Sequence, residues 1–375
     1  MIQAIYIHIP FCLKKCFYCD FPSFTYKEEE LIEQYVQSLI CEINSTKINL
    51  EEGATLYFGG GTPSLLSLTQ LESIFSALLN NGWSFSEVSL EANPGTVSKD
   101  KLRGFKEIGI NRLSFGVQSF NNKLLRNIGR IHNREEAIQA ILWAQEAGFK
   151  NINIDLMNSL PKQSIYDVYE DLLLAIELEP THVSAYALKI EENTIFYKLA
   201  AGDDNFQPND LIQERMYDLI PRVLENNGFK RYEISNFAKP NYECRHNKVY
   251  WHYRNYFAFG LGACSFYGRK RETNTFVLEE YLTLKKSLHN TIREVENITA
   301  ADYQSEYIFM NLRLVEGLNC ITYANKFSED LLVKYSEIIE RHLKAGLLFF
   351  PEKNILALTE RGFKYSNIVF RDFIN

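Results

Sequence analysis

The sequence lacks any apolar run long enough to cross a bilayer, and it also lacks an export signal. Residues 1–10 have neither a basic start nor a small-residue cleavage site. Basic residues are in deficit, since the formal net charge is −7, and a general nucleic-acid-binding surface is therefore not expected. We predict a cytoplasmic protein with no transmembrane segment and no nucleic-acid partner, while a transient association with membranes stays open.

Cysteine is scarce, but three of the seven cysteines lie in one short run, Cys12, Cys16 and Cys19, with the spacing C-x3-C-x2-C. A chain without an export signal keeps its thiols reduced, which favours a metal site over disulfides. Three thiolates can bind three irons of a cubane cluster and leave the fourth iron open, whereas structural zinc sites and electron-transfer clusters take four ligands. We therefore predict a 4Fe-4S cluster. The alternative is a zinc knuckle with His8 as fourth ligand, which the position of His8 within a strand disfavours.

The first half of the sequence alternates short β-rich runs with segments of helical periodicity. The strands are expected at 4–9, 54–58, 87–91, 112–117, 151–157 and 182–188, and the helices at 28–48, 67–80, 99–108, 134–147 and 165–178. This alternation predicts βαβ units with a parallel sheet. No dinucleotide-binding fingerprint follows the first strand, which favours a partial (β/α)6 barrel over a doubly wound sheet.

The pattern changes after residue 188, so we predict three parts. Residues 1–228 form the α/β partial barrel, and residues 229–298 form an aromatic-rich connecting segment. Residues 299–375 are expected to form a smaller helical, winged-helix-like domain, because helical patterns precede a strand pair near 347–358.

Polar and glycine residues follow the predicted strands at the ends where parallel barrels bind their ligands. The second strand leads into Gly59-Gly60-Gly61-Thr62, and a glycine-rich turn lets a ligand approach the backbone. Glu91, Gln118 and Asp155 stand at the ends of the third to fifth strands, and Arg130 follows the fourth. Carboxylates and an amide suit hydroxyl and ammonium groups, and arginine can bind a carboxylate through two hydrogen bonds. Taken singly, each of these features also has an ordinary structural explanation, a plain turn for the glycines and a helix cap for a strand-end carboxylate.

The cysteine run and these strand ends together resemble the radical S-adenosylmethionine (SAM) superfamily. From Tyr6 to the C-terminus the chain resembles the family of oxygen-independent coproporphyrinogen III oxidases and their relatives. The resemblance implies that the three cysteines bind the cluster and that the amino and carboxyl groups of SAM chelate its open iron. It implies SAM contacts at Tyr6, Tyr18, Gly60, Gly61, Thr62, Glu91, Gln118, Arg130 and Asp155. Gly61 and Thr62 would recognise the amino group, Arg130 the carboxylate, and Gln118 and Asp155 the ribose; Lys189 and Cys264 align with further contact positions.

Three features favour the haem chaperones of the HemW type over the oxidases of that family. Phe21 stands where the oxidases carry a further cysteine, and few residues precede Tyr6, where the oxidases have a longer segment. Residues 246–251 have the pattern His-Asn-x-x-Tyr-Trp, which resembles a haem-binding signature of HemW. Imidazole is a common axial ligand of haem iron, so the resemblance implies haem binding by His246. The alternative is that His246 is a hydrogen-bonded histidine in a packed loop.

The leading hypothesis is a haem chaperone that binds haem, carries a SAM-liganded 4Fe-4S cluster and delivers haem to an acceptor protein. One alternative is an oxygen-independent coproporphyrinogen III oxidase, which would decarboxylate a porphyrinogen propionate by radical chemistry. The other is a radical SAM enzyme that acts on another substrate. The sequence leaves open whether the chain is an enzyme.

Overall fold

Six parallel strands build the first half of the chain, at the positions that the sequence predicts. They are β1 (Ile2–Ile9), β4 (Leu50–Gly60), β5 (Glu87–Ala92), β6 (Arg112–Gln118), β7 (Asn151–Asn158) and β8 (His182–Ala187), and each pairs in parallel with the next. The computed structural model describes residues 1–25, 29–203, 205–283 and 292–374. Glu28, where the first helix was predicted to begin, lies outside these ranges, as does part of the segment 229–298.

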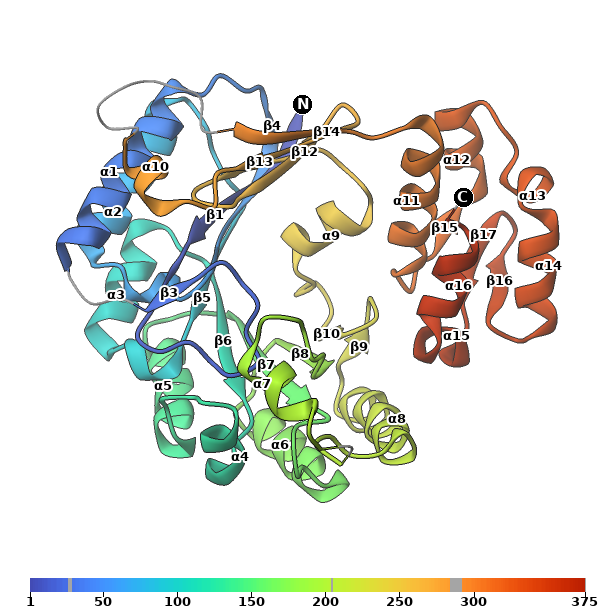
Figure 1. Cartoon of the computed structure of the whole chain (residues 1–375), viewed down its shortest axis with the longest axis horizontal. Helices are drawn as coiled ribbons and strands as arrows, with labels where there is room; N and C mark the ends of the chain where they lie inside the picture. Colours follow the sequence, from blue (N-terminus) through green and yellow to red (C-terminus); the bar gives the residue numbers. More distant parts are fainter. Residues whose placement is uncertain (26–28, 204, 284–291, 375) are drawn as a thin grey trace.

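Helices cover the outer face of this sheet (Figure 1). The longer ones are α1 (Glu29–Ser45), α2 (Leu68–Asn80), α3 (Lys99–Ile108), α5 (Arg134–Glu146), α6 (Ile165–Glu177) and α8 (Asp210–Asn226). Shorter helices follow individual strands, η1 (Pro63–Leu65) after β4, η2 (Pro94–Thr96) after β5, α4 (Asn122–Asn127) after β6 and α7 (Ile195–Ala200) after β8. Helix α7 lies beside the cysteine run, where the amide of Phe196 donates to the carbonyl of Phe17. Ser67 and Ser164 begin α2 and α6 with capping boxes. In each, the serine side chain accepts the backbone amide of the residue three positions later, and the side chain of that residue accepts the backbone amide of the serine. Strand residues such as Leu56 and Phe58 are fully buried in the core beneath the helices.

The segment after α8 adds strands to both edges of the sheet, which the sequence did not predict. β11 (Tyr256–Phe259) pairs in parallel with β1, and β12 (Cys264–Tyr267), β13 (Lys270–Asn274) and β14 (Ile292–Asn297) continue that edge antiparallel. β10 (Asn236–Ala238) and β9 (Lys230–Arg231) extend the β8 edge. Two further short strands, β2 (Phe11–Cys12) and β3 (Phe24–Thr25), pair with each other on either side of the cysteine run. The sheet is thus an open barrel that extends beyond the six strands.

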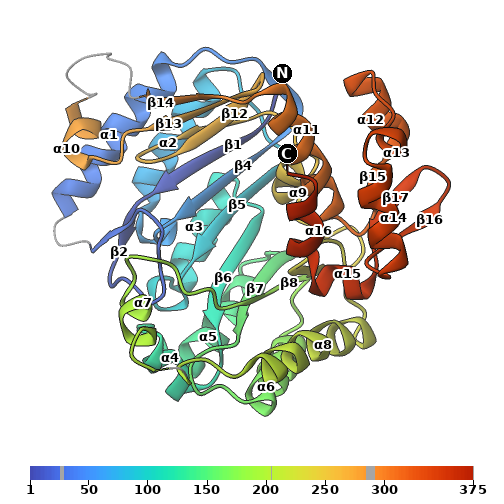
Figure 2. The same cartoon turned by 45° about the vertical axis from the view of Figure 1, so that its right-hand side comes forward.

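The C-terminal part has its own hydrophobic core and lies to one side of the barrel (Figures 1 and 2). Its helices are α11 (Ala300–Leu312), α12 (Cys320–Phe327), α13 (Leu331–Lys334), α14 (Ser336–Lys344), α15 (Glu360–Lys364) and α16 (Ser366–Asp372). Its three-stranded sheet has the order β15 (Leu318–Asn319), β17 (Ile355–Leu358), β16 (Leu348–Glu352). This is the smaller winged-helix-like part that the sequence predicts, although the exact division of the chain at 228 and 298 stays a prediction. No helix in the described ranges is long and apolar enough to span a membrane.

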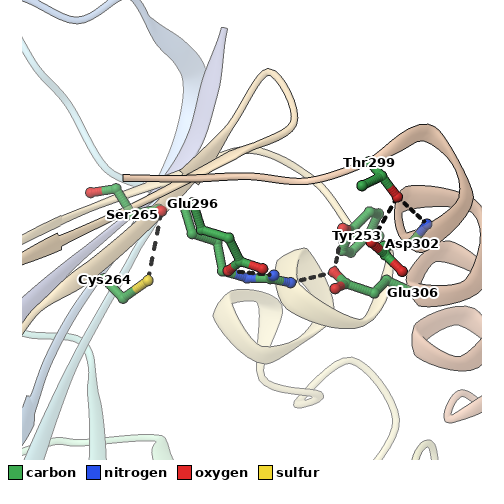
Figure 3. A network of polar contacts seen from close by, with 8 residues as sticks. Tyr253, Cys264, Ser265, Glu296, Thr299, Asp302 and Glu306 are labelled. Atoms are coloured by element: carbon green, nitrogen blue, oxygen red, sulfur yellow. Dashed lines mark hydrogen bonds and ion pairs between the residues drawn. The ribbon is translucent and has the colours of Figure 1, made fainter. Parts of the chain in front are cut away.

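A polar network joins this C-terminal part to the edge of the sheet (Figure 3). Arg271 on β13 pairs with Glu296 on β14 and with Glu306 on α11. Glu306 also accepts a hydrogen bond of 2.5 Å from the hydroxyl of Tyr253. Thr299 begins α11 by accepting a hydrogen bond from the backbone amide of Asp302. These contacts place α11 beside the helix that carries the His-Asn-x-x-Tyr-Trp motif.

That helix, α9 (Arg245–Trp251), is attached to the barrel by Glu87, a glutamate on β5. Elsewhere in the chain, the short helix α10 (Leu278–Leu282) lies beside α1. The carboxylate of Glu87 accepts hydrogen bonds from the backbone amides of Arg245 (3.2 Å) and His246 (3.0 Å). Glu87 is buried, and a negative charge at a helix N-terminus is favourable. Glu87 therefore fixes the start of α9 to the sheet.

Glu87→Ala should destabilise the protein, because it leaves two amides at the start of α9 without their charged acceptor. Each hydrogen bond to a charged group contributes about 1.5–3 kcal/mol, so we expect a loss of at least about 1.5 kcal/mol in the free energy of unfolding. Chemical denaturation measures this loss. Glu72→Ala, at an exposed position on α2, is the control and should change stability by less than about 0.5 kcal/mol. Equal stability of the two variants would contradict the role of Glu87.

Candidate functional site

A cavity of about 480 Å³ lies at the C-terminal ends of the parallel strands. The structure brings the three cysteines and most of the predicted SAM contacts to its wall. These residues are Cys12, Cys16, Cys19, Tyr18, Gly60, Gly61, Thr62, Glu91, Gln118, Arg130 and Asp155. Lys189 also lines the cavity, where it forms an ion pair with Glu191 at 2.5 Å. The strand-end rule thus predicted residues that share one cavity.

Cys12 ends β2, and Cys16 and Cys19 lie on the loop between β2 and β3; all three are free thiols. The loop turns at Cys16, whose carbonyl accepts the amide of Cys19 at 3.3 Å. Thr62 donates its hydroxyl to Cys12 Sγ and Arg130 donates Nη1 to Cys16 Sγ, both at 3.5 Å. Burial raises the pKa of the Cys12 and Cys19 thiols. Because metals bind the thiolate, loading this loop would release protons.

The chemistry of the donor set, three thiolates on one short run, is compatible with an iron–sulfur cubane. Within the described ranges, no group of three or more His, Cys, Asp or Glu side chains is placed to hold one metal ion. In a cubane each thiolate binds a different iron, so three sulfurs need not converge on one point. His8, the candidate zinc ligand, is turned away: its ring nitrogens bond to Tyr6 Oη at 3.1 Å and to the carbonyl of Pro22 at 2.9 Å.

Arg130 stands between the cysteine loop and the strand ends. Its Nη2 donates to the carbonyl of Gly116, while its Nε is buried with no hydrogen-bond partner in the described part of the chain. A side chain at position 116 would crowd this arrangement, since a Cβ there would lie 3.2 Å from Nη2 of Arg130. A half-buried guanidinium whose Nε has no partner among the described residues is suited to a carboxylate.

Glu91 is held by two donors at the cavity wall. Tyr57 donates its hydroxyl to Oε1 at 2.9 Å, and the backbone amide of Gly60 donates to Oε2 at 3.1 Å. Burial raises the pKa of Glu91 to about 7, although both hydrogen bonds oppose the rise. The neighbouring Gly59 must be small, because a Cβ there would lie 2.8 Å from the ring of Tyr6 and 3.1 Å from Oε1 of Glu91. Glu91 can therefore accept a proton or a hydrogen bond from a ligand near neutral pH.

Gln118 and Asp155 are oriented by hydrogen bonds from other strand side chains of the barrel interior. Gln118 has a left-handed backbone (φ 70°) at an irregularity of β6, and its Oε1 accepts the hydroxyl of Tyr186 at 2.7 Å. Asp155 accepts hydrogen bonds from Ser114 at 3.1 Å and Asn153 at 2.7 Å. Burial raises the pKa of Asp155, and its hydrogen bonds oppose that rise. Both are positioned acceptors, as a ligand rich in hydroxyl groups requires.

His246 lies behind the cavity rather than on its wall, although the next residue, Asn247, lines it. The imidazole is 1% exposed. Nδ1 bonds to Thr55 Oγ1 and Nε2 to Tyr250 Oη, each at 2.8 Å, and the ring packs against Tyr57 with centroids 5.0 Å apart. Burial lowers the pKa of His246 to about 3, so the imidazole is neutral at pH 7.

Tyr6 also lies away from the main cavity, in a hollow of about 250 Å³ that we call the aromatic hollow. The hollow is lined by Tyr6, His8, Phe21, Pro22, Tyr250, Tyr256, Gly262, Ala263 and Cys264. Phe21 lines the main cavity as well and is 59% exposed. Tyr250 lines the hollow while its hydroxyl bonds to His246, so it stands between the two.

Among the residues of the cavity wall that sequence reasoning missed are three large side chains, Tyr57, Tyr186 and Arg112. Arg112 is 2% exposed. Its Nη1 donates a hydrogen bond to Oδ1 of Asn151 at 2.5 Å, while its Nε has no hydrogen-bond partner in the described ranges. All three stand at alternate strand positions, opposite in phase to buried residues such as Leu56 and Leu113. The alternation of side chains along each strand is therefore the sequence signal that could have identified these three residues.

Comparison with known proteins places these features in a family. Residues 6–174 match the model of the radical SAM superfamily. Over its whole length the chain is 34% identical to the "Heme chaperone HemW" of Bacillus subtilis, covering 99% of that protein. It is 35% identical to the protein of the same name from Escherichia coli over 84% of this chain and 83% of that protein. Among solved structures, coproporphyrinogen III oxidase (HemN) from Escherichia coli matches with a TM-score of 0.86 at 23% identity, covering 100% of this chain and 90% of that chain. At this identity the match shows the fold.

Cys16→Ala should abolish a 4Fe-4S cluster, because it removes one of the three thiolates on the loop. Anaerobic reconstitution of the unaltered protein should give about four irons per chain with sulfur-to-iron charge-transfer absorbance. Cys320→Ala removes a buried thiol on α12, outside the cavity lining, and should keep both signals. Retention of iron and absorbance in Cys16→Ala would rule out the assignment.

Arg130→Ala should weaken SAM binding roughly ten- to hundredfold, because a charge-assisted hydrogen bond contributes about 1.5–3 kcal/mol. Calorimetric titration of the reconstituted protein measures the dissociation constant. Iron content must be measured in parallel, since Arg130 also contacts Cys16. Arg126→Ala, on the exposed side of α4, is the matched control. An unchanged dissociation constant at full iron content would remove Arg130 from the SAM site.

Proposed function

We propose, because this chain belongs to the HemW family of the radical SAM superfamily, that it is a haem chaperone. In this proposal it binds haem, carries a SAM-liganded 4Fe-4S cluster and passes the haem to an acceptor protein. The observation that carries the proposal is that the similarity to proteins named haem chaperones spans the whole chain, α9 included. Two features of the structure support its parts, namely the cavity and the environment of His246.

The cavity supports the cluster and SAM parts. Cys12, Cys16 and Cys19 would hold a cluster, which supplies an open iron for the amino and carboxyl groups of SAM. The half-buried guanidinium of Arg130, whose Nε has no partner in the described ranges, suits the SAM carboxylate. Gln118, oriented by Tyr186, and Asp155, oriented by Ser114, suit the ribose hydroxyls. The backbone at Gly60 to Thr62 allows close approach of the amino group.

His246 meets two requirements of an axial haem ligand. It is neutral, and in the tautomer protonated on Nδ1 it donates to Thr55, which leaves the lone pair on Nε2. Ligating histidines commonly donate their other ring N–H to a partner that fixes the ring. The lone pair of Nε2 now accepts the hydroxyl of Tyr250. Iron binding therefore requires that this bond break, at a cost of about 0.5–1.5 kcal/mol.

The aromatic hollow is where a porphyrin could approach His246. Its volume of about 250 Å³ is below the roughly 300–1,000 Å³ of sites that enclose drug-sized ligands. A haem would therefore lie across the hollow, with one face on Tyr6, Tyr256 and Phe21, rather than inside it. Movement of Tyr250 would connect the hollow with Nε2 of His246. Aromatic packing and one iron ligand together suit a cargo that must later be released.

The oxidase alternative has weaker support. The match to coproporphyrinogen III oxidase reflects the fold, and the position where the oxidases carry a further cysteine is here Phe21. Protoporphyrinogen formation from coproporphyrinogen by the reconstituted protein would overturn the chaperone proposal.

His246→Ala should weaken haem binding at least tenfold or shift the Soret band, because it removes the proposed iron ligand. Absorption titration with haem measures both, and iron–sulfur content should stay unchanged, since the cysteine loop lies elsewhere in the chain. His342→Ala removes a histidine of similar burial from α14, whose Nε2 bonds to Asp372 at 2.9 Å, and is the control for general destabilisation.

Three outcomes are informative. Loss in His246→Ala but not in His342→Ala supports the ligand assignment. Equal binding by His246→Ala and the unaltered protein would move the ligand elsewhere and leave the chaperone role intact. A haem affinity of the unaltered protein no better than that of an unrelated barrel enzyme would contradict the function itself.

A further inference from the structure

Tyr57 links the two proposed ligand sites by direct contact. Its hydroxyl donates to Oε1 of Glu91 at 2.9 Å, on the wall of the main cavity. Its ring packs against the imidazole of His246, with centroids 5.0 Å apart and planes inclined by 30°. The two sites lie far apart in the sequence, on β5 and α9, and β4 brings Tyr57 between them.

The Glu91 end of this link is defined by few contacts. Oε1 accepts the Tyr57 hydroxyl and Oε2 accepts the Gly60 amide, so the carboxylate is oriented by one side chain and one backbone group. Gly60 has a left-handed backbone (φ 112°) and belongs to the turn that would receive the SAM amino group. A displaced Tyr57 would therefore alter both the direction and the solvation of Glu91.

The His246 end has two arrangements that can be distinguished. In the structure the imidazole is buried, with Nε2 on Tyr250 and one ring face on Tyr57. A haem ligand would need Nε2 free of Tyr250, and an imidazole turned toward the aromatic hollow would leave the ring of Tyr57. Packed interiors have little free volume, so the side chain of Tyr57 must respond to the space that the imidazole leaves.

We propose that Tyr57 is a positioning residue that makes SAM and haem antagonistic ligands of this chain. SAM binds best when Glu91 is oriented by Tyr57, and Tyr57 is positioned for this by the buried imidazole of His246. Haem binds best when that imidazole has left Tyr57. Bound SAM therefore favours the arrangement that does not ligate haem. By thermodynamic linkage, bound haem lowers the affinity for SAM by the same factor.

This inference rests on the proposed function and adds a step to it, the release of the cargo. A chaperone must hold haem during transport and lose it at the acceptor. With antagonistic ligands, SAM binding at the cluster lowers the affinity for haem without any covalent change in haem or SAM. Coupling between sites in proteins is commonly about 5- to 150-fold, and the lower end suffices for such a bias.

The test is a thermodynamic cycle on the cluster-reconstituted full chain. Haem is titrated by its Soret absorbance with and without saturating SAM, and SAM is titrated by calorimetry with and without haem. For the unaltered protein we expect SAM to raise the haem dissociation constant at least about fivefold, and haem to raise that of SAM by the same factor. Equal haem constants with and without SAM would overturn the proposal.

Tyr57→Phe is the decisive variant because it keeps the ring on His246 and removes only the hydroxyl that orients Glu91. Tyr186→Phe is the matched control, since Tyr186 also donates its hydroxyl to a proposed SAM contact, Gln118, at 2.7 Å. Both variants should bind SAM more weakly. Only Tyr57→Phe should reduce the effect of SAM on haem to less than about twofold, whereas Tyr186→Phe should keep the full factor.

The outcomes separate this inference from the proposed function. Absence of haem binding by the unaltered protein would contradict the function. Binding of both ligands without mutual effect would contradict only the coupling. Antagonism that persists at full strength in Tyr57→Phe would mean that the two ligands compete for space, and would remove Tyr57 from the role. The reciprocal titrations on the unaltered protein do not depend on any variant folding.

Discussion

The alternation of apolar and polar residues along the parallel strands is the constraint on which the rest of this structure depends. On β4, Leu56 and Phe58 face the core beneath the helices, while Thr55 and Tyr57 face the barrel interior. The inner positions of β6 and β7 are likewise polar, with Ser114 and Asn153 bonded to each other across the strands. Buried polar groups need partners, and neighbouring strands supply them here. The same groups leave acceptors and donors directed into the cavity.

This polar interior also explains how a segment from the second half of the chain is bound to the barrel. Glu87, at the inner start of β5, accepts the first amides of α9, and Thr55 bonds to the imidazole of His246. Tyr232 adds a further link, because its hydroxyl accepts the amide of Cys244 at 3.4 Å and bonds to His182 at 2.9 Å. Helix α9 is therefore bonded into the barrel interior rather than attached at its surface. Its position depends on strand residues that precede it by more than a hundred positions.

Local sequence signals were sufficient to predict the six strands and the helices of the barrel. They were not sufficient for the strands that pair with distant parts of the chain. The six strands and their helices carry clear periodicity and glycine breaks, such as Gly109, which ends α3 in a left-handed conformation. β10 and β11 are short, and their pairing with β8 and β1 joins residues as distant as Ala4 and Tyr256, which no local pattern contains. The cavity residues followed from the strand-end rule together with the family resemblance. The contacts of His246 did not, because they depend on how α9 docks against β4.

As the proposed haem ligand, His246 would have to be both neutral and accessible, and its burial supports the first requirement while it opposes the second. A histidine in water has a pKa near 6.5 and is partly charged near neutral pH, whereas iron needs the neutral ring. Burial keeps the ring neutral and lets Thr55 fix Nδ1, but it also closes the path to Nε2. The two ends of α9 are anchored independently of that ring. Glu87 holds the first amides, and Trp251 lies under the guanidinium of Arg313, 4.2 Å from the ring centroid. Access to Nε2 therefore requires that the hydroxyl of Tyr250 leave it and that the imidazole turn from Tyr57 toward the aromatic hollow, while both ends of α9 stay anchored.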